Sequence, residues 1–168
     1  MISTMLRELI ESARDLLPEQ EEWEMMNSMP KRAPKPLTID VPDDYRELLT
    51  VSDGLGCGPV TVFSSKYVAK NQTYTEPIEG AATVLDPEMW FCFGTIDEDP
   101  LLIERSTGAV HGFPDTGVIW WQSTRFEQYA PSLDKFLAEH VFGPGYPDLV
   151  GDDDDQWCEL LRRLGRLN

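Results

Sequence analysis

Only two imidazole side chains, His111 and His140, are available for catalysis, so any Ser-His-Asp or Cys-His set must use one of them. His140 falls on the apolar side of a predicted helix, near its carboxyl end, where an imidazolium would meet the negative end of the helix dipole. His111 follows a predicted hairpin turn and alternates with Val110, as a cross-strand residue does. We therefore expect structural roles for both histidines and no enzymatic activity, with a hydrolase that uses His111 as the alternative.

Two runs of acidic residues could hold a cation. The first, Asp97-Glu98-Asp99, precedes Pro100 in a predicted turn, but it lacks the glycine and glutamate positions of an EF-hand loop. The second, Asp152-Asp153-Asp154-Asp155, precedes a predicted helix, where carboxylates stabilise the positive end of the dipole. For the first run we expect a solvated turn or a loop that faces a partner. For the second we expect a helix cap, an interaction patch or both, with cation binding as a further alternative.

The cysteines and a glycine-rich segment do not predict a cofactor. Cys57, Cys92 and Cys158 are odd in number and widely spaced, which fits neither a disulfide framework nor a zinc site. The segment Gly54-Leu55-Gly56-Cys57-Gly58 has the glycine content of a phosphate-binding loop. However, it follows a predicted helix instead of a strand and contains no Lys-Ser or Lys-Thr. We expect no metal, no nucleotide and no other cofactor.

The net charge of −16, from 30 acidic and 14 basic side chains, restricts which partners can approach. Nucleic-acid binding requires Lys and Arg to displace counterions from phosphates, so the field has the wrong sign for it, and an anionic membrane surface is disfavoured for the same reason. A basic protein would be attracted and its association accelerated. The alternative is that the charge serves only solubility.

Helices are predicted at both ends of the chain. Apolar residues recur at three- and four-residue intervals between a Ser3 cap and Pro18, the pattern of an amphipathic helix. The proline-rich, partly basic segment Glu19–Pro36 predicts a linker or an arm. A second helix is predicted over Val41–Leu49, with Pro42 at its first position. Further helices are predicted from Ser132 to Val141 and from about Asp155, with a rigid turn over 143–147 joining them.

The middle of the chain predicts strands. Short apolar, β-branched or aromatic runs bounded by turn residues occur at 60–63, 90–96, 101–103 and 118–121, and residues 104–111 predict a hairpin turn around Gly108. In a strand, the adjacent Trp120 and Trp121 would point to opposite faces, so that one is buried and the other is either covered or exposed as a binding anchor. The pattern predicts a single α+β domain: an N-terminal helix and Pro-rich arm at 1–36, a core at about 37–142, and an acidic loop with the C-terminal helix at 143–168.

Three segments in order resemble the SUKH superfamily: Val41–Leu49 running into Ser52-Asp53-Gly54, Pro100–Ile103 leading into Thr107–Val110, and Pro131–Leu137. This superfamily contains fungal cell-wall synthesis regulators and bacterial immunity proteins that neutralise toxins. The resemblance covers roughly Leu37 to Val141, and it implies a twisted antiparallel sheet flanked by helices and a binding function without catalysis. The residues that carry the structural pattern here are Pro42, Tyr45, Leu48, Gly54, Gly108, Ser132 and Phe136.

Charge and resemblance together predict a protein-binding module, an immunity protein that masks a basic toxin domain such as a nuclease. The alternative is an intracellular regulatory or scaffold protein, in which the basic arm or the acidic tail recruits partners. Residues 1–17 do not have the pattern of a signal peptide, and no apolar run of about 18 residues is present, so we expect a cytoplasmic monomer. The candidate partner-binding residues are Asp97, Glu98, Asp99, Asp115, Trp120, Trp121, Asp152, Asp153 and Asp154.

Overall fold

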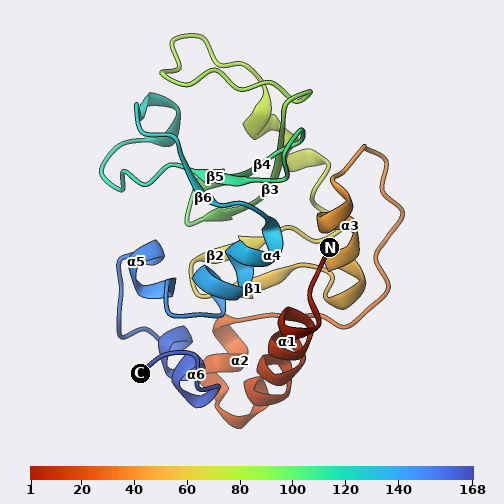
Figure 1. The fold of residues 1–168 in the computed structure, drawn as a ribbon, viewed down its shortest axis with the longest axis vertical. Helices are drawn as coiled ribbons and strands as arrows, with labels where there is room; N and C mark the ends of the chain where they lie inside the picture. The colour runs from red at the N-terminus through yellow and green to blue at the C-terminus, as the bar shows by residue number, and fades with distance from the viewer.

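The computed structural model describes residues 1–168 as one antiparallel sheet surrounded by helices (Figure 1). The six strands follow one another across the sheet in chain order, so each neighbouring pair is antiparallel. This arrangement confirms the predicted α+β fold class. The strands are β1 Leu55–Cys57, β2 Val60–Val62, β3 Trp90–Ile96, β4 Asp99–Glu104, β5 Val110–Gly112 and β6 Glu127–Ala130.

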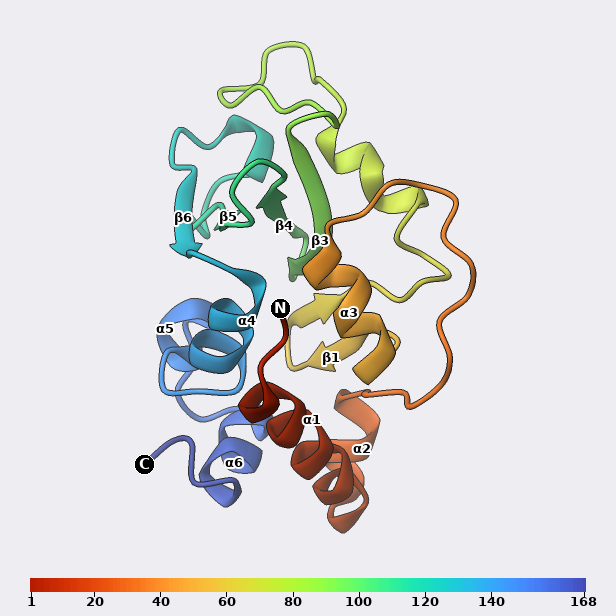
Figure 2. The same cartoon turned by 45° about the vertical axis from the view of Figure 1, so that its right-hand side comes forward.

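The helices lie mainly before the sheet and after it in the chain. The α-helices are α1 Thr4–Leu16, α2 Glu21–Met26, α3 Asp43–Val51, α4 Leu133–Phe136, α5 Tyr146–Val150 and α6 Gln156–Arg163. Three 3-10 helices, η1 Leu17–Glu19, η2 Lys70–Thr75 and η3 Trp120–Gln122, and the π-helical segment η4 Leu137–Val141 complete the set. In both views α1, α2 and α6 lie together at one end of the molecule, and the loops near η2 and η3 lie at the other (Figures 1 and 2). None of the helices combines the length and apolar character that a membrane crossing requires.

Strand β3 is buried on both faces of the sheet. Successive residues of a strand point to opposite faces, yet Phe91, Cys92 and Phe93 are all fully buried. Tyr45 of α3 packs on Phe91, with ring centroids 5.0 Å apart, and Phe136 of α4 packs edge-on against Phe93 at 6.0 Å. The largest apolar cluster therefore includes side chains of the central strand and of helices from both halves of the chain.

The second predicted helix is present as α3, and its residues contribute to the core and to the turn that follows. Pro42 is the N-cap of α3 and not its first helical residue, so that detail of the prediction was wrong by one position. Tyr45 and Leu48 are fully buried, and the Tyr45 hydroxyl donates to the Phe63 carbonyl at 2.7 Å. Gly54 adopts φ +90°, and a Cβ there would come within 3.0 Å of the Val62 carbonyl oxygen, so glycine is required.

The other pattern residues shape the hairpin and the helix after the sheet. Gly108 has φ +80° in the β4–β5 turn, as the hairpin prediction required. The Ser132 hydroxyl accepts from the Lys135 N–H at 3.1 Å and so caps α4. Phe136 is fully buried. The helix predicted from Ser132 to Val141 begins where expected and continues from α4 into η4.

The predicted strand at 118–121 was wrong. Trp120 and Trp121 lie in η3, and the sixth strand comes later, at Glu127–Ala130. The Ser123 N–H donates to the Trp120 carbonyl at 3.1 Å, and the Ser123 hydroxyl accepts from the Arg125 N–H at 3.1 Å, so local hydrogen bonds compete with strand pairing. In a 3-10 turn, adjacent side chains do not point to opposite faces, and both tryptophans are half-buried.

The prediction of a linker or arm over Glu19–Pro36 was wrong for its first half. Residues 21–26 form α2, and Trp23 is 2% exposed, because its side chain packs into the core. Ser28 forms a β-bridge with Gly56, which extends the sheet beyond β1. Only residues 30–36 are extended and irregular. The Arg32 guanidinium pairs with Asp53 at 3.0 Å, so even this basic stretch is attached to the domain.

The predicted rigid turn over 143–147 is likewise replaced in part by a short helix, α5, which starts at Tyr146. The Tyr146 side chain is fully buried and its hydroxyl donates to the Asp155 carboxylate at 2.5 Å. This contact fixes α5 against the start of α6. Asp155 also accepts from the Cys158 N–H at 2.8 Å and so caps α6, as predicted.

Candidate functional site

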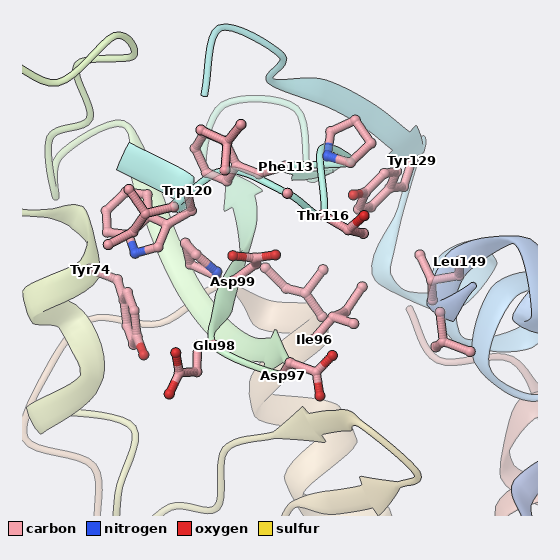
Figure 3. A pocket seen from close by; sticks show the side chains of 17 residues that line it. Tyr74, Ile96, Asp97, Glu98, Asp99, Phe113, Thr116, Trp120, Tyr129 and Leu149 are labelled. Carbon is pink, nitrogen blue, oxygen red and sulfur yellow. The ribbon is translucent and has the colours of Figure 1, made fainter. Parts of the chain in front are cut away.

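A groove with a volume of about 1030 Å³ opens where the β3–β4 turn, the loop before η3, and α5 meet. Tyr74 and Trp120 lie along one wall, Tyr129 and Leu149 along the opposite wall, and the acidic turn residues lie between them (Figure 3). The complete lining consists of Tyr74, Ile96, Asp97, Glu98, Asp99, Pro100, Leu101, Phe113, Pro114, Thr116, Gly117, Val118, Ile119, Trp120, Tyr129, Leu149 and Val150.

The tight β3–β4 turn positions the acidic residues. Ile96 pairs with Asp99, so only Asp97 and Glu98 lie between the two strands. Asp97 has φ +52°, and it is the only non-glycine residue of the chain with a positive φ; aspartate tolerates this left-handed conformation better than most residues. The Asp97 N–H donates to the Pro59 carbonyl at 2.9 Å, which attaches the turn to the loop before β2. A short, anchored turn therefore holds these carboxylates at the groove.

The negative charge of the groove is not compensated. The lining contains three carboxylates and no Lys, Arg or His. None of the three, Asp97, Glu98 and Asp99, takes part in an ion pair. Burial raises the pKa of Asp99 above its ordinary value of 3.8, and the neighbouring Asp97 and Glu98 carboxylates raise it further. Unpaired like charges destabilise one another, so a positive group bound in the groove would relieve their repulsion.

Aromatic side chains form the wall beside the acids. The Trp120 ring lies 5.8 Å from Tyr74 and 5.5 Å from Phe113, measured between ring centroids. Gln72 holds η2, and with it Tyr74, against the sheet, because its side-chain amide exchanges two hydrogen bonds with the backbone of Cys92. Burial raises the pKa of Tyr74, and the Cys92 thiol and the Glu98 and Asp99 carboxylates add to the increase.

The opposite wall and the rim are more apolar. Burial raises the pKa of Tyr129 to about 12, with further contributions from the Asp99 and Glu127 carboxylates, so its hydroxyl remains a proton donor at neutral pH. Leu149 and Val150 come from α5. Val118 and Ile119 are 43% and 52% exposed on the rim. Aliphatic side chains are thus presented to solvent beside the carboxylates.

The structure brings together four of the nine candidate partner-binding residues: Asp97, Glu98, Asp99 and Trp120 all line the groove. Trp121 does not line it, although it follows Trp120 directly. Asp115 is also outside the lining. Its carboxylate pairs with Arg125 at 2.9 Å, and Arg125 also pairs with Glu127 at 3.1 Å, so its charge is partly compensated within the chain.

The acidic run at 152–155 lies apart from the groove lining. Besides the Asp155 cap, the Asp152 carboxylate accepts from the Asp154 N–H at 2.9 Å, and the Arg162 guanidinium lies 3.8 Å from the Asp154 carboxylate. These contacts organise the loop before α6. Partner binding by Asp152, Asp153 and Asp154 remains a prediction.

The potential catalytic groups pack against aromatic rings or are buried. The His111 ring lies 4.9 Å from Trp90 and 5.3 Å from Phe126, and its buried Nδ1 has no hydrogen-bond partner, hence no carboxylate that could orient it. His140 packs beside Phe136 at 5.9 Å. The cysteines are buried and free, and burial raises the pKa of Cys92 to about 12. No three His, Cys, Asp or Glu side chains are grouped as a metal site.

Apart from Trp120, sequence reasoning missed the residues that form the walls of the groove. Tyr74, Phe113, Tyr129 and Leu149 come from four separate elements, and nothing in their local sequence indicates that they converge. The strand order places β6, and with it Tyr129, beside β5, but it does not locate the residues that come from helices.

A family comparison relates the chain to known proteins. The model of the SMI1 / KNR4 family (SUKH-1) matches residues 15–139 of the 168. The match begins before α2, so it includes the segment 19–36, which the resemblance seen in the sequence alone did not cover. A comparison with curated proteins found no significant match. Because the family model covers well over half of the chain, the protein belongs to the SMI1/KNR4 (SUKH-1) family.

Proposed function

We propose that the protein is a non-catalytic immunity protein that neutralises a basic toxin domain in the cytoplasm by binding and masking it. The family fits either a toxin-immunity or a regulatory role. The observation that supports the choice is the groove, where three unpaired carboxylates lie beside half-buried aromatic rings and exposed aliphatic groups. Such a surface is matched to a basic protein that also has apolar side chains to bury.

A nuclease is a suitable target for this chemistry. A protein that holds phosphates must itself be basic, and its substrate surface is therefore complementary to an acidic one. An inhibitor with a net charge of −16 would associate quickly at low salt, and an interface of about 1,600 Å² would cover the substrate-binding region. Masking needs no chemical step in the inhibitor, which agrees with a His111 ring packed against Trp90 and Phe126.

The regulatory alternative assigned recruitment to the basic, proline-rich arm or to the acidic tail, and the structure bears on the arm. In the fold, this arm forms ion pairs and a hydrogen bond with the rest of its own domain. Arg32 pairs with Asp53, Lys31 lies 3.8 Å from Glu11, and the Lys35 N–H donates to the Ser65 hydroxyl at 2.7 Å. An arm held in this way offers fewer free groups to a partner, so we favour the immunity role.

Affinity capture followed by a growth assay tests this function. The full chain is immobilised, exposed to lysate of the source cells, and eluted in steps of rising salt, and the eluted proteins are identified by mass spectrometry. We expect one basic protein that elutes only at high salt, that stops growth when expressed alone, and that is harmless when co-expressed with this chain. Recovery of several cell-wall or signalling proteins, none of them toxic, would instead favour the regulatory role.

A further inference from the structure

We propose that the groove holds a basic, apolar polypeptide segment of the partner, with one arginine guanidinium between the Tyr74 and Trp120 rings and the Glu98 and Asp99 carboxylates. An apolar residue next to that arginine would rest against Tyr129 and Leu149. The inference deepens the proposed function and rests on it for the identity of the protein that carries the segment.

The charges select a cation. Three carboxylates without an ion-pair partner lie in a groove whose lining has no basic side chain. Many other acids of this acidic chain also lack an ion pair, but these three are held close together by a tight turn inside a groove. A positive group of a partner would supply the counterion that this cluster lacks.

The aromatic wall favours arginine over lysine. A guanidinium is planar, can stack on tyrosine or tryptophan, and can at the same time donate two hydrogen bonds to a carboxylate. Tyr74 and Trp120 form one wall, and Glu98 and Asp99 lie beside them (Figure 3). Stacking and bidentate pairing can therefore occur together at this place. An ammonium group would make the ionic contact but would lack the planar fork.

The apolar groups favour a polypeptide over a small organic cation. Leu149 and Val150 line the far wall, and the exposed Val118 and Ile119 extend the apolar surface to the rim. A free cation would leave these groups in water. The volume of about 1030 Å³ leaves room for a short polypeptide segment.

Titration of the uniformly ¹⁵N-labelled full chain with short peptides tests the inference. The probe is acetyl-Gly-Ile-Arg-Leu-Gly-amide, compared with the same peptide containing citrulline, a neutral residue of the same shape, and with free arginine amide. We expect the arginine peptide to shift the Glu98 and Asp99 amide signals and the Trp120 indole signal. We expect the citrulline peptide to bind about tenfold more weakly, the loss that two partly exposed ion pairs would cause. Equal affinity for both peptides, shifts confined to other regions, or equal binding of free arginine amide would overturn it.

Matched variants locate the contact. Glu98→Gln with Asp99→Asn should weaken the arginine peptide about tenfold and leave the citrulline peptide unchanged. Trp120→Leu should weaken both peptides, and its spectrum shows whether the variant is folded. The control is Glu22→Gln with Glu24→Gln, which changes the net charge equally at exposed sites on α2 that do not line the groove. If the control weakens binding as much as the groove variant, a general charge effect explains the binding and the inference fails.

These experiments distinguish a failure of the groove inference from a failure of the proposed function. If the peptides do not bind, or bind without the arginine preference, while a captured toxin still binds and is neutralised, then the groove inference is wrong and the proposed function survives. If the arginine peptide binds in the groove as described but no toxic partner is found, then the groove inference stands and the immunity role fails.

Discussion

Neutralising two groove acids, Glu98→Gln together with Asp99→Asn, should make the free protein more stable. Asp97, Glu98 and Asp99 form three repulsive pairs, and none of them has an attractive partner. A like-charge pair on a protein surface costs about 0.3–0.5 kcal/mol, so removing two charges, and with them all three pairs, should raise the free energy of unfolding by about 1 kcal/mol. For a chain of this length the melting temperature should rise by about 2–4 °C.

The pH dependence of this gain follows from Asp99. Burial, with help from its acidic neighbours, raises the pKa of Asp99 in the folded protein, so ionisation of its carboxyl destabilises the fold. This penalty is absent below the ordinary value of 3.8 and develops as the pH rises through the raised pKa of the folded state. The variant should therefore exceed the wild type in stability at pH 7, and the two should converge near pH 3.5.

Urea denaturation followed by tryptophan fluorescence measures the difference. The control is Asp115→Asn with Glu127→Gln, which removes the same charge but breaks the two ion pairs of Arg125, so it should be less stable than the groove variant. Because both variants reduce the net charge equally, their difference isolates the local environment. A groove variant that is less stable than wild type, or that gains no more than the control, would refute the reasoning. The gain should also shrink in 1 M salt, where the Debye length is about 3 Å.

Three further predictions concern parts of the fold outside the groove. Asp53→Ala should lower the free energy of unfolding by about 2 kcal/mol, because the buried Ser65 N–H, which donates to Asp53 at 2.8 Å, would lose its acceptor. Asp53→Asn should cost less, and equal losses in denaturation curves would argue against this hydrogen bond. Trp23→Ala should lower the free energy of unfolding by about 3–5 kcal/mol, because Trp23 is buried. The same substitution in a free arm would leave the stability nearly unchanged. Cys57 and Cys92 should react with a thiol reagent at pH 8 only after unfolding, because burial raises the pKa of both thiols; fast labelling of the folded chain would contradict this.

The elements that could be predicted are those whose periodic pattern and end signals agree. The first helix has a buried apolar stripe, and the Ser3 hydroxyl accepts from the Leu6 N–H at 3.1 Å, as its sequence indicated. The strand over Trp90–Ile96 was predicted with its observed bounds, because β-branched and aromatic residues fill a position buried on both faces. The hairpin turn was predicted from Gly108, and this glycine has the positive φ that the turn requires.

The errors occur where side-chain contacts decide the local structure. Val118-Ile119-Trp120-Trp121 has the composition of a strand, yet it forms a rim loop and a 3-10 turn that places Trp120 beside Tyr74. Composition alone cannot distinguish a strand from an exposed apolar loop, because both are rich in β-branched and aromatic residues. Similarly, residues 21–26 are acidic and short enough to read as a linker, and only the burial of Trp23 holds them as a helix.

The acidic half of the groove and Trp120 could be predicted, and the other wall residues could not. The run Asp97-Glu98-Asp99 was identified as a candidate site because three consecutive carboxylates precede a proline in a predicted turn. Tyr129 is part of a strand with two exposed residues, and Leu149 lies in a five-residue helix that no periodicity reveals. Asp115 was included on charge alone, since its pairing with Arg125 depends on the loop conformation.

The affinity of the captured basic partner for three forms of the chain tests the central claim most directly. Wild type, Glu98→Gln/Asp99→Asn and the control Glu22→Gln/Glu24→Gln are compared at physiological salt by calorimetry. If the groove acids hold the partner, the groove variant should bind about tenfold more weakly than wild type, and the control should bind within about twofold of it. Equal affinities for the groove variant and the control would contradict the account.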